Sequence, residues 1–243
     1  MQSIFDRHQI IALEFSGGKD SLACLYMLKD YWHKIIVVWC NTGAAFPETI
    51  EQMAKIKAMV PYFLEVKSDQ PADIELNGLP VDVLPYSNTE YSNIFEGKND
   101  QKMRIFFDCC KNNIWLPMHD AITKLGATLV IRGQKLSDKN KSPVRSGYSF
   151  DGIEYLFPLE DMTDDDVYSY LKQINVELPR NYGYIRTSLD CWSCTAYVFE
   201  NVGKLRYMRE HHPEKAAILA GNLAMIKEAA EMPLRFIDMA IGD

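Results

Sequence analysis

No stretch of the chain approaches the roughly 18 uninterrupted apolar residues of a membrane-spanning helix, so we expect no membrane segment. The N-terminus, MQSIFDRH, lacks the basic region followed by an apolar region that marks a secretory signal peptide. Internal repeats and low-complexity segments are also missing. These absences predict a cytoplasmic protein. Its 243 residues, 47% of them hydrophobic, suffice for one large or two small domains.

An excess of basic residues is likewise missing, because 33 acidic side chains outnumber 26 basic ones and the net charge is −7. This balance excludes a surface that is basic all over. It is compatible with local positive patches, since a bound polyanion responds to charges within about 8 Å at physiological salt. The six cysteines do not indicate a disulfide framework in a cytoplasmic chain, so clustered cysteines are candidates for metal ligation or redox chemistry.

Apolar runs alternate with helical patterns through the first half of the chain. Strands are expected at residues 10–15, 35–40, 62–67 and 128–131, and helices at residues 20–32, 47–59 and 112–125. Such an alternation predicts an α/β fold with a doubly wound, mostly parallel sheet. Sheets of this kind bind their ligands at the carboxyl ends of the strands.

Two segments interrupt the alternation: residues 68–100 resemble an insertion, and residues 134–149 form a polar, basic loop. A further helix is expected from Thr163 to about residue 175, because Thr163 precedes three aspartates. We therefore expect an α/β domain over residues 1–195 and a helical C-terminal extension over residues 196–243. Helix breaks in the extension are expected at Gly203, Pro213, Gly221 and Pro233.

The most informative motif directly follows the first expected strand and consists of Ser16, Gly17, Gly18, Lys19, Asp20 and Ser21. The two glycines allow a tight turn that brings backbone N–H groups close to an anion. The serine hydroxyls can donate hydrogen bonds, and the lysine supplies a cation. The helix that begins near the aspartate directs its positive end to the same point. The motif therefore predicts a nucleotide phosphate site.

A second block, Asn41, Thr42 and Gly43, leaves the second expected strand and leads into a helix that Pro47 opens. A Thr-Gly turn in this place is suited to hold a nucleotide.

Residues 16–21 resemble the phosphate loop of the PP-loop family, the ATP pyrophosphatases, which cleave ATP to AMP and pyrophosphate. Residues 41–49 resemble the Asp-Thr-Gly-x-x-Phe-Pro-Glu-Thr block of the phosphoadenosine phosphosulfate reductase branch of that superfamily, with Asn41 replacing the usual Asp. Arg132 and Gly133 stand where the family has a Gly-x-Arg nucleotide contact, in changed order. With a Pro-Leu run further on, the resemblance covers about residues 8–198 and implies an adenine nucleotide alpha hydrolase-like fold.

Two cysteine pairs lie far apart in the sequence: Cys109 with Cys110, and Cys191 with Cys194. A Cys-x-x-Cys turn points two thiolates to one side, which suits a soft metal. The set resembles the iron–sulfur ligands of adenylylsulfate reductases in this family, which implies a [4Fe-4S] cluster on the four cysteines. Zinc, or thiols without metal that include a redox-active Cys-x-x-Cys, are the alternatives.

One departure from the family concerns the reductase nucleophile. Sulfonucleotide reductases carry a cysteine near the C-terminus in a Glu-Cys-Gly-x-His segment, and here no cysteine follows Cys194. The phosphate loop, which is degenerate in those reductases, is intact here. Both points favour ATP as the nucleotide. The resemblance then implies that Ser16, Lys19 and Asp20 are catalytic, with Asp20 helping to hold Mg²⁺.

The chain looks most like the ATP pyrophosphatases of DNA phosphorothioation systems, which implies sulfur transfer to an adenylated acceptor. We expect a nucleic-acid substrate and, as sulfur donor, a cysteine desulfurase or another persulfide protein. The expected assembly is a homodimer. Candidate contacts with a polyanion are Lys135, Lys139, Lys141, Arg145, Arg180, Tyr184 and Arg186. These side chains could instead solvate a loop or bind ATP phosphates. The alternatives are a sulfonucleotide reductase whose nucleophile comes from elsewhere and a non-catalytic nucleotide-binding subunit.

Overall fold

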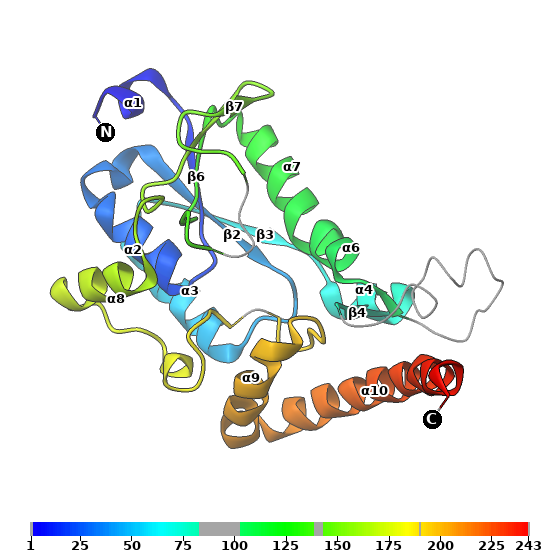
Figure 1. Cartoon of the computed structure of the whole chain (residues 1–243). Coiled ribbons are helices and arrows are strands. Elements are labelled where there is room, and N and C mark those ends of the chain that lie inside the picture. The colour runs from blue at the N-terminus through cyan, green and yellow to red at the C-terminus, as the bar shows by residue number, and fades with distance from the viewer. Residues whose placement is uncertain (1, 83–102, 139–142, 190, 243) are drawn as a thin grey trace. The chain divides into compact units, whose positions relative to one another are not determined.

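The computed structural model describes residues 2–82, 103–138, 143–189 and 191–242 (Figure 1). The chain divides into two compact units, each built from separate segments. Unit 1 comprises Met1–Asn41, Pro47–Lys67 and Leu116–Tyr182, and unit 2 comprises Thr42–Phe46, Ser68–Trp115 and Gly183–Asp243. The expected domain boundary at residue 195 falls inside unit 2.

Unit 1 contains a six-stranded sheet with the strand order β3-β2-β1-β6-β8-β7. Its strands are β1 (Ile11–Glu14), β2 (Ile35–Asn41), β3 (Tyr62–Lys67), β6 (Leu129–Ile131), β7 (Ser149–Phe150) and β8 (Ile153–Leu156). All neighbouring strands pair in parallel except β7 and β8, which are antiparallel. The predicted α/β fold with a mostly parallel sheet is confirmed.

The centre of this sheet is its most buried part. In β1, which β2 and β6 flank, the side chains of Ile11, Ala12 and Leu13 are 0% exposed, so both faces of the strand are covered. Helices cover the sheet on both sides, with α2 and α3 on one and α7 on the other (Figure 1). Unit 1 contains α1 (Gln2–Arg7), α2 (Lys19–Met27), α3 (Pro47–Met59), α7 (Leu116–Leu125) and α8 (Asp164–Gln173). The helix predicted over residues 20–32 continues beyond Met27 as a 3-10 helix, η1 (Lys29–Lys34).

Unit 2 is mostly helical. It contains α4 (Gln70–Asn77), α6 (Phe106–Cys110), the π-helical turn η3 (Lys111–Trp115), α9 (Val198–His211), α10 (Pro213–Ile241) and a short parallel pair, β4 (Leu79–Val81) with β5 (Met103–Ile105). Within the segment predicted as an insertion, residues 70–81 thus form a helix and a strand. The rest of it, from residue 83 to 100, lies outside the described residues.

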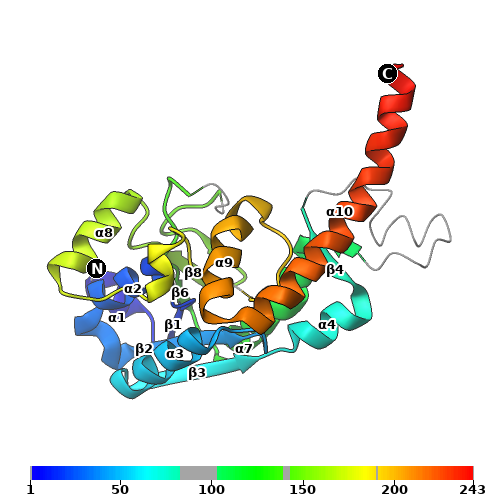
Figure 2. The ribbon, with the colours of Figure 1, turned by 90° about the horizontal axis from the view of Figure 1, so that it is seen from below.

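Three of the four predicted helix breaks in the C-terminal extension are wrong. Helix α9 runs through Gly203, and α10 runs through residues 221 and 233 as one continuous helix (Figure 2). Only Pro213 marks a boundary, as the first residue of α10, where its missing N–H costs no helical hydrogen bond. Gly203 is there for packing, because a Cβ at this position would lie 2.1 Å from Cγ2 of Ile185.

Candidate functional site

The strand order of unit 1 indicates where a ligand would bind. From β1 the chain adds β2 and β3 on one side and later β6 and β8 on the other, so the order reverses between β1 and β6. Open α/β sheets bind ligands at such a switch point, beyond the carboxyl ends of the strands. The loop after β1 holds residues 16–21, and the loop after β6 holds residues 132–138.

Residues 16–21 form a closed loop around the hydroxyl of Ser21. This hydroxyl accepts a hydrogen bond from the backbone N–H of Gly17 at 3.0 Å and donates one to the carbonyl of Gly18 at 3.0 Å. The N–H of Gly18 donates to Oγ of Ser16 at 3.3 Å. Gly17 has φ +82°, a left-handed conformation that glycine adopts readily. The local sequence thus forms the tight turn that was predicted.

Helix α2 begins at Lys19, and Gly18 is its N-cap residue. The first N–H groups of a helix lack partners within the helix and attract anions. Here the N–H of Lys19 donates to the hydroxyl of Tyr182 at 2.6 Å. The phenol therefore takes a position that a phosphate oxygen would take in a nucleotide-bound loop.

Two lysines and three aspartates form connected ion pairs beside this loop. We call them the Lys–Asp cluster, which consists of Lys19, Asp20, Lys135, Asp138 and Asp164. The Lys19 ammonium lies 2.9 Å from Oδ2 of Asp20 and 2.8 Å from Oδ1 of Asp164. The Lys135 ammonium lies 2.7 Å from Oδ1 of Asp20, 2.8 Å from Asp138 and 3.3 Å from Asp164.

Lys135 was predicted as a contact for a polyanion, with solvation of the loop or binding of ATP phosphates as the alternatives. Its side chain is 1% exposed and belongs to the Lys–Asp cluster. Burial alone would lower the pKa of this ammonium, but hydrogen bonds to Asp138 and Asp20 hold the pKa above its ordinary value. Lys135 thus stays charged and gives the phosphate loop a second cation.

Gly133 brings the β6 loop against the phosphate loop. A Cβ on Gly133 would lie 2.8 Å from the carbonyl carbon of Asp20 and 3.0 Å from the backbone nitrogen of Ser21. The adjacent Arg132 forms an ion pair with Glu14 of β1 at 2.7 Å and lies over the ring of Tyr155. Gly133 thus allows the two backbones to approach closely, and Arg132 links the end of β6 to β1 through its ion pair. The predicted contact of these two residues with a nucleotide stays a prediction.

Asn41, Thr42 and Gly43 are split between the units. Asn41, in unit 1, donates from its side-chain amide to Glu65 at 2.8 Å. Thr42 and Gly43, in unit 2, lie at the N-terminal side of α4, where the N–H of Gln70 donates to the Thr42 carbonyl at 2.8 Å. Gly43 has φ +75°, which explains a glycine in this turn.

The Cys-x-x-Cys turn contacts the Thr42 segment. Sγ of Cys191 and Oγ1 of Thr42 are 3.2 Å apart, and the N–H of Trp192 donates to the Ala44 carbonyl at 3.0 Å. A hydrogen bond of 3.1 Å from Cys194 N–H to the Cys191 carbonyl closes the turn. Two motifs that lie far apart in the sequence are therefore in contact within unit 2. They are the block that begins at Asn41, through Thr42, and the Cys-x-x-Cys turn, through Cys191.

Cys109 lies buried at the end of α6, near several N–H donors. Nε2 of Gln70 and Nδ2 of Asn113 are each 3.8 Å from its Sγ. Burial raises the pKa of the Cys109 thiol, and the charge of Arg104 opposes this rise. Arg104 is 1% exposed and forms an ion pair with Asp73.

All six cysteines lie among the described residues, and none is in a disulfide. Four thiols are soft donors that suit iron–sulfur or zinc centres. Within the described ranges, however, no three His, Cys, Asp or Glu side chains form a group that could hold a metal ion. The metal centre on the two cysteine pairs thus stays a prediction.

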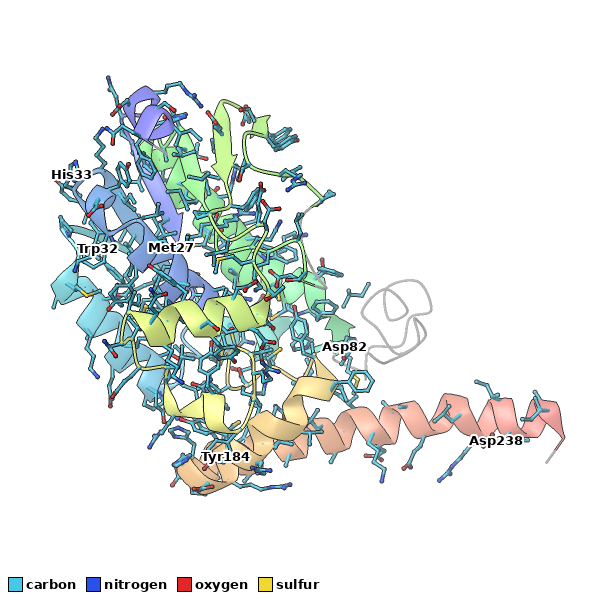
Figure 3. The ribbon with its side chains drawn as sticks, turned by 60° about the vertical axis from the view of Figure 1, so that its left-hand side comes forward. Met27, Trp32, His33, Asp82, Tyr184 and Asp238 are labelled. Atoms are coloured by element: carbon cyan, nitrogen blue, oxygen red, sulfur yellow. The ribbon has the colours of Figure 1, made fainter. Side chains whose placement is uncertain are left out.

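The remaining predicted polyanion contacts that the structure describes are divided between the two units, with Arg145 and Arg180 in unit 1 and Tyr184 and Arg186 in unit 2. Arg145, 58% exposed, pairs with Asp161, and Arg180 pairs with Glu48. Tyr184 lies beside α9 and packs edge-on against Tyr207 (Figure 3). Lys139 and Lys141 lie outside the described residues, and Arg186 is exposed in unit 2.

Sequence reasoning missed Asp138, Asp164 and Gln70 as site residues. Asp164 had a visible local role as the first residue of α8, after the capping residue Thr163. Its contact with Lys19 depends on how α8 packs near α2, which no local pattern encodes. No helix in the described part of the chain is long and apolar enough to cross a membrane.

Comparison with known proteins identifies a family. The profile of the phosphoadenosine phosphosulfate reductase domain matches residues 10–197. The fold is similar to the crystal structure of phosphoadenylyl-sulfate (PAPS) reductase from Candida auris in its phosphate complex, with a TM-score of 0.51 and 17% identity. That alignment covers 75% of this chain and 81% of the reductase. A search among curated proteins finds no match.

Proposed function

Because the chain belongs to the phosphoadenosine phosphosulfate reductase domain family, we propose that it is an ATP pyrophosphatase that adenylates an acceptor for sulfur incorporation. The observation that carries this proposal is the intact phosphate loop, closed around Ser21 and flanked by the ammonium groups of Lys19 and Lys135. A loop with two cations suits a leaving pyrophosphate better than the single sulfate-bearing phosphate of a sulfonucleotide.

In the proposed reaction an acceptor oxygen attacks the α-phosphorus of ATP. The bond from that phosphorus to the bridging oxygen of the β-phosphate breaks, pyrophosphate leaves with the electron pair, and the acceptor proton passes to solvent. Lys19, Lys135 and the first amides of α2 stabilise the charge on the leaving group. The outer sulfur of a persulfide then attacks the activated carbon or phosphorus of the acceptor, and AMP departs with the oxygen. A second thiol attacks the inner sulfur of the acceptor–donor disulfide, which leaves the outer sulfur on the acceptor in place of the oxygen and joins the donor to that thiol as a disulfide.

Magnesium, when bound with ATP, supplies charge neutralisation at the phosphates. Asp20, Asp138 and Asp164 offer the oxygen ligands that Mg²⁺ prefers. Each of these carboxylates is already bonded to a lysine ammonium. The residues thus fit the ion by donor type, and its ligation would compete with these ion pairs.

The sulfur chemistry is assigned to unit 2. We propose that Cys109, Cys110, Cys191 and Cys194 handle sulfur or hold a [4Fe-4S] cluster, and that a cysteine desulfurase or similar persulfide protein supplies the sulfur. The support is the shared soft-donor chemistry and the contact of Cys191 with Thr42. No step above requires the cluster.

The test is to incubate anaerobically purified protein with ATP and Mg²⁺ and to separate the products by ion-exchange chromatography. AMP and pyrophosphate are expected in equal amounts. Lys19→Ala should lower the rate by about 100-fold or more, since it removes a cation from the leaving group. Lys55→Ala, at an exposed position of α3, is the matched control and should leave the rate unchanged. ATP bound but not cleaved with any acceptor would instead indicate a nucleotide-binding subunit.

A second candidate function is favoured by the 3.2 Å contact between Cys191 and Thr42. In this alternative the Cys191 thiolate attacks the sulfur of a sulfonucleotide, and the nucleotide phosphate leaves. Cys194 then attacks the Cys191 sulfur, sulfite departs, and a dithiol protein reduces the resulting disulfide. Sulfite release without ATP consumption, lost in Cys191→Ser, would establish this reaction and overturn the first proposal.

A further inference from the structure

Gln70 is a buried polar side chain that neither the phosphate loop nor the predicted metal ligands explain. It is the first residue of α4, directly after the N-cap Asp69, and it is 2% exposed. Buried amides are normally hydrogen-bonded at both ends, because an unpaired buried polar group is costly. The partners of Gln70 therefore show what it organises.

The two ends of the Gln70 amide reach different cysteine segments. Its Nε2 is 3.8 Å from Sγ of Cys109 on α6. Its Oε1 accepts a hydrogen bond of 2.6 Å from Oγ of Ser193, the residue before Cys194 in the Cys-x-x-Cys turn. One amide group thus spans the gap between two segments that are far apart in the sequence.

The backbone of Gln70 closes a ring of contacts. Its N–H donates to the Thr42 carbonyl at 2.8 Å, and the Thr42 hydroxyl meets the Cys191 thiol at 3.2 Å. Thr42, Cys191, Ser193 and Gln70 therefore form a closed circuit in which each member restrains the next. The side chain of Gln70 attaches Cys109 to this circuit.

We propose that Gln70 is a positioning residue that holds the Cys109 thiol and the Cys191–Cys194 turn together, so that the two cysteine pairs act as one sulfur-handling site. The sulfur-handling role of this site rests on the proposed function, whereas the placement of the thiols by Gln70 does not. This placement can be tested in the protein alone, without added nucleotide, metal or partner.

Thiol cross-linking tests the proposal. Reduced full-length protein is treated with dibromobimane, which becomes strongly fluorescent when both of its arms have reacted with thiols, and the linked peptides are identified by mass spectrometry. A link between the peptide with residues 109–110 and the peptide with residues 191–194 is expected. In Gln70→Met, which keeps the size but loses the amide, the yield of this link should fall roughly fivefold to tenfold. Links within each pair should persist.

Ser193→Ala breaks the same connection from the other end. It should lower the yield by a similar factor, and the double variant should fall no further, because both changes remove one interaction. Gln173→Met, at an exposed position of α8, is the matched control. If Gln70→Met fails to melt cooperatively, Ser193→Ala carries the test, since it deletes a single hydroxyl.

An unchanged yield in a folded Gln70→Met protein, or additive losses in the double variant, would overturn the proposal. Lys19→Ala separates it from the proposed function, because that variant should lose ATP cleavage and keep the cross-link. If the wild-type protein forms the cross-link but does not cleave ATP, the proposed function is refuted and the positioning role of Gln70 is supported.

Discussion

The hydroxyl of Tyr182 lies 2.6 Å from the backbone nitrogen of Lys19 and accepts its hydrogen bond. A phenol thus occupies the amide at the start of α2, which the proposed function assigns to a nucleotide phosphate. The ring of Tyr182 in turn packs edge-on against Tyr168, whose face lies near the Lys19 ammonium. A nucleotide phosphate bound at the proposed site would have to displace this hydroxyl.

Tyr182→Phe is therefore expected to bind ATP more tightly, by roughly threefold to tenfold, because the phosphate no longer competes with a neutral hydrogen bond. Calorimetric titration with a non-hydrolysable ATP analogue measures the change. Tyr26→Phe, whose hydroxyl contacts Met59 elsewhere in unit 1, should bind like the wild type. Weaker binding by Tyr182→Phe would show instead that the phenol contacts the nucleotide.

Gly133→Ala should damage the phosphate loop. Its Cβ would meet the backbone of Asp20 at 2.8 Å, and backbone atoms cannot move aside as a flexible side chain can. We expect a loss of about 1–3 kcal/mol in the free energy of unfolding and a lower rate of AMP formation. Gly221→Ala is the control, since nothing lies within 4 Å of a Cβ at that position. A Gly133→Ala protein with wild-type stability and activity would contradict the close packing of the two loops.

Asp73→Asn tests the buried ion pair with Arg104. Burial alone would raise the pKa of Asp73, but hydrogen bonds from Arg104, Asn77 and Asn113 hold it below its ordinary value. This carboxylate therefore contributes stability above about pH 4, and the contribution is lost as the pH falls through the lowered pKa.

The Asn variant should lose about 3 kcal/mol of unfolding free energy at neutral pH, because the Arg104 charge stays buried without its carboxylate. Its stability should also fall less steeply between about pH 4 and pH 2 than that of the wild type. Urea denaturation over this pH range measures both effects. Asp120→Asn, at an exposed position of α7, should follow the wild-type curve. If the free energy of unfolding falls equally steeply with decreasing pH in Asp73→Asn and in the wild type, the lowered pKa of Asp73 is contradicted.

The predicted cluster has its own spectroscopic test. Protein purified without oxygen should be coloured by the charge-transfer absorption of a thiolate-bound iron–sulfur centre, and Cys191→Ser should lose most of this absorption. Cys24→Ser is the control, since Cys24 is buried in α2 and burial raises the pKa of its thiol. A colourless protein that contains zinc would refute the iron–sulfur assignment, and metal-free protein would leave the thiols as the working groups.

Local signals made much of the fold predictable. The strand at residues 62–67 and the helix at residues 47–59 agree with β3 and α3, because apolar runs, Pro47 and flanking turns mark them in the sequence. The strands β7 and β8 were missed. They are short, and β7 is exposed, so neither has the apolar continuity that marks a buried strand.

The site was predictable only where it is contiguous in the chain. Residues 16–21 form the expected turn, because its glycine and serine positions fix the geometry within one loop. Lys135 instead joins that loop because the strand order brings β6 beside β1, and Gln70 reaches Cys109 and Ser193 through helix packing. Such long-range contacts leave no periodic trace in a single sequence.

If the proposed nucleotide contacts Thr42, the 3.2 Å contact between Thr42 and Cys191 would link nucleotide affinity to thiol reactivity within unit 2. If ATP alters the equilibrium for modification of Cys191 by some factor, then modification must alter the affinity for ATP by the same factor. Under the proposed function, oxidation of this sulfur would therefore change how the Thr42 turn binds its nucleotide, and the bound nucleotide would change how readily the sulfur is oxidised.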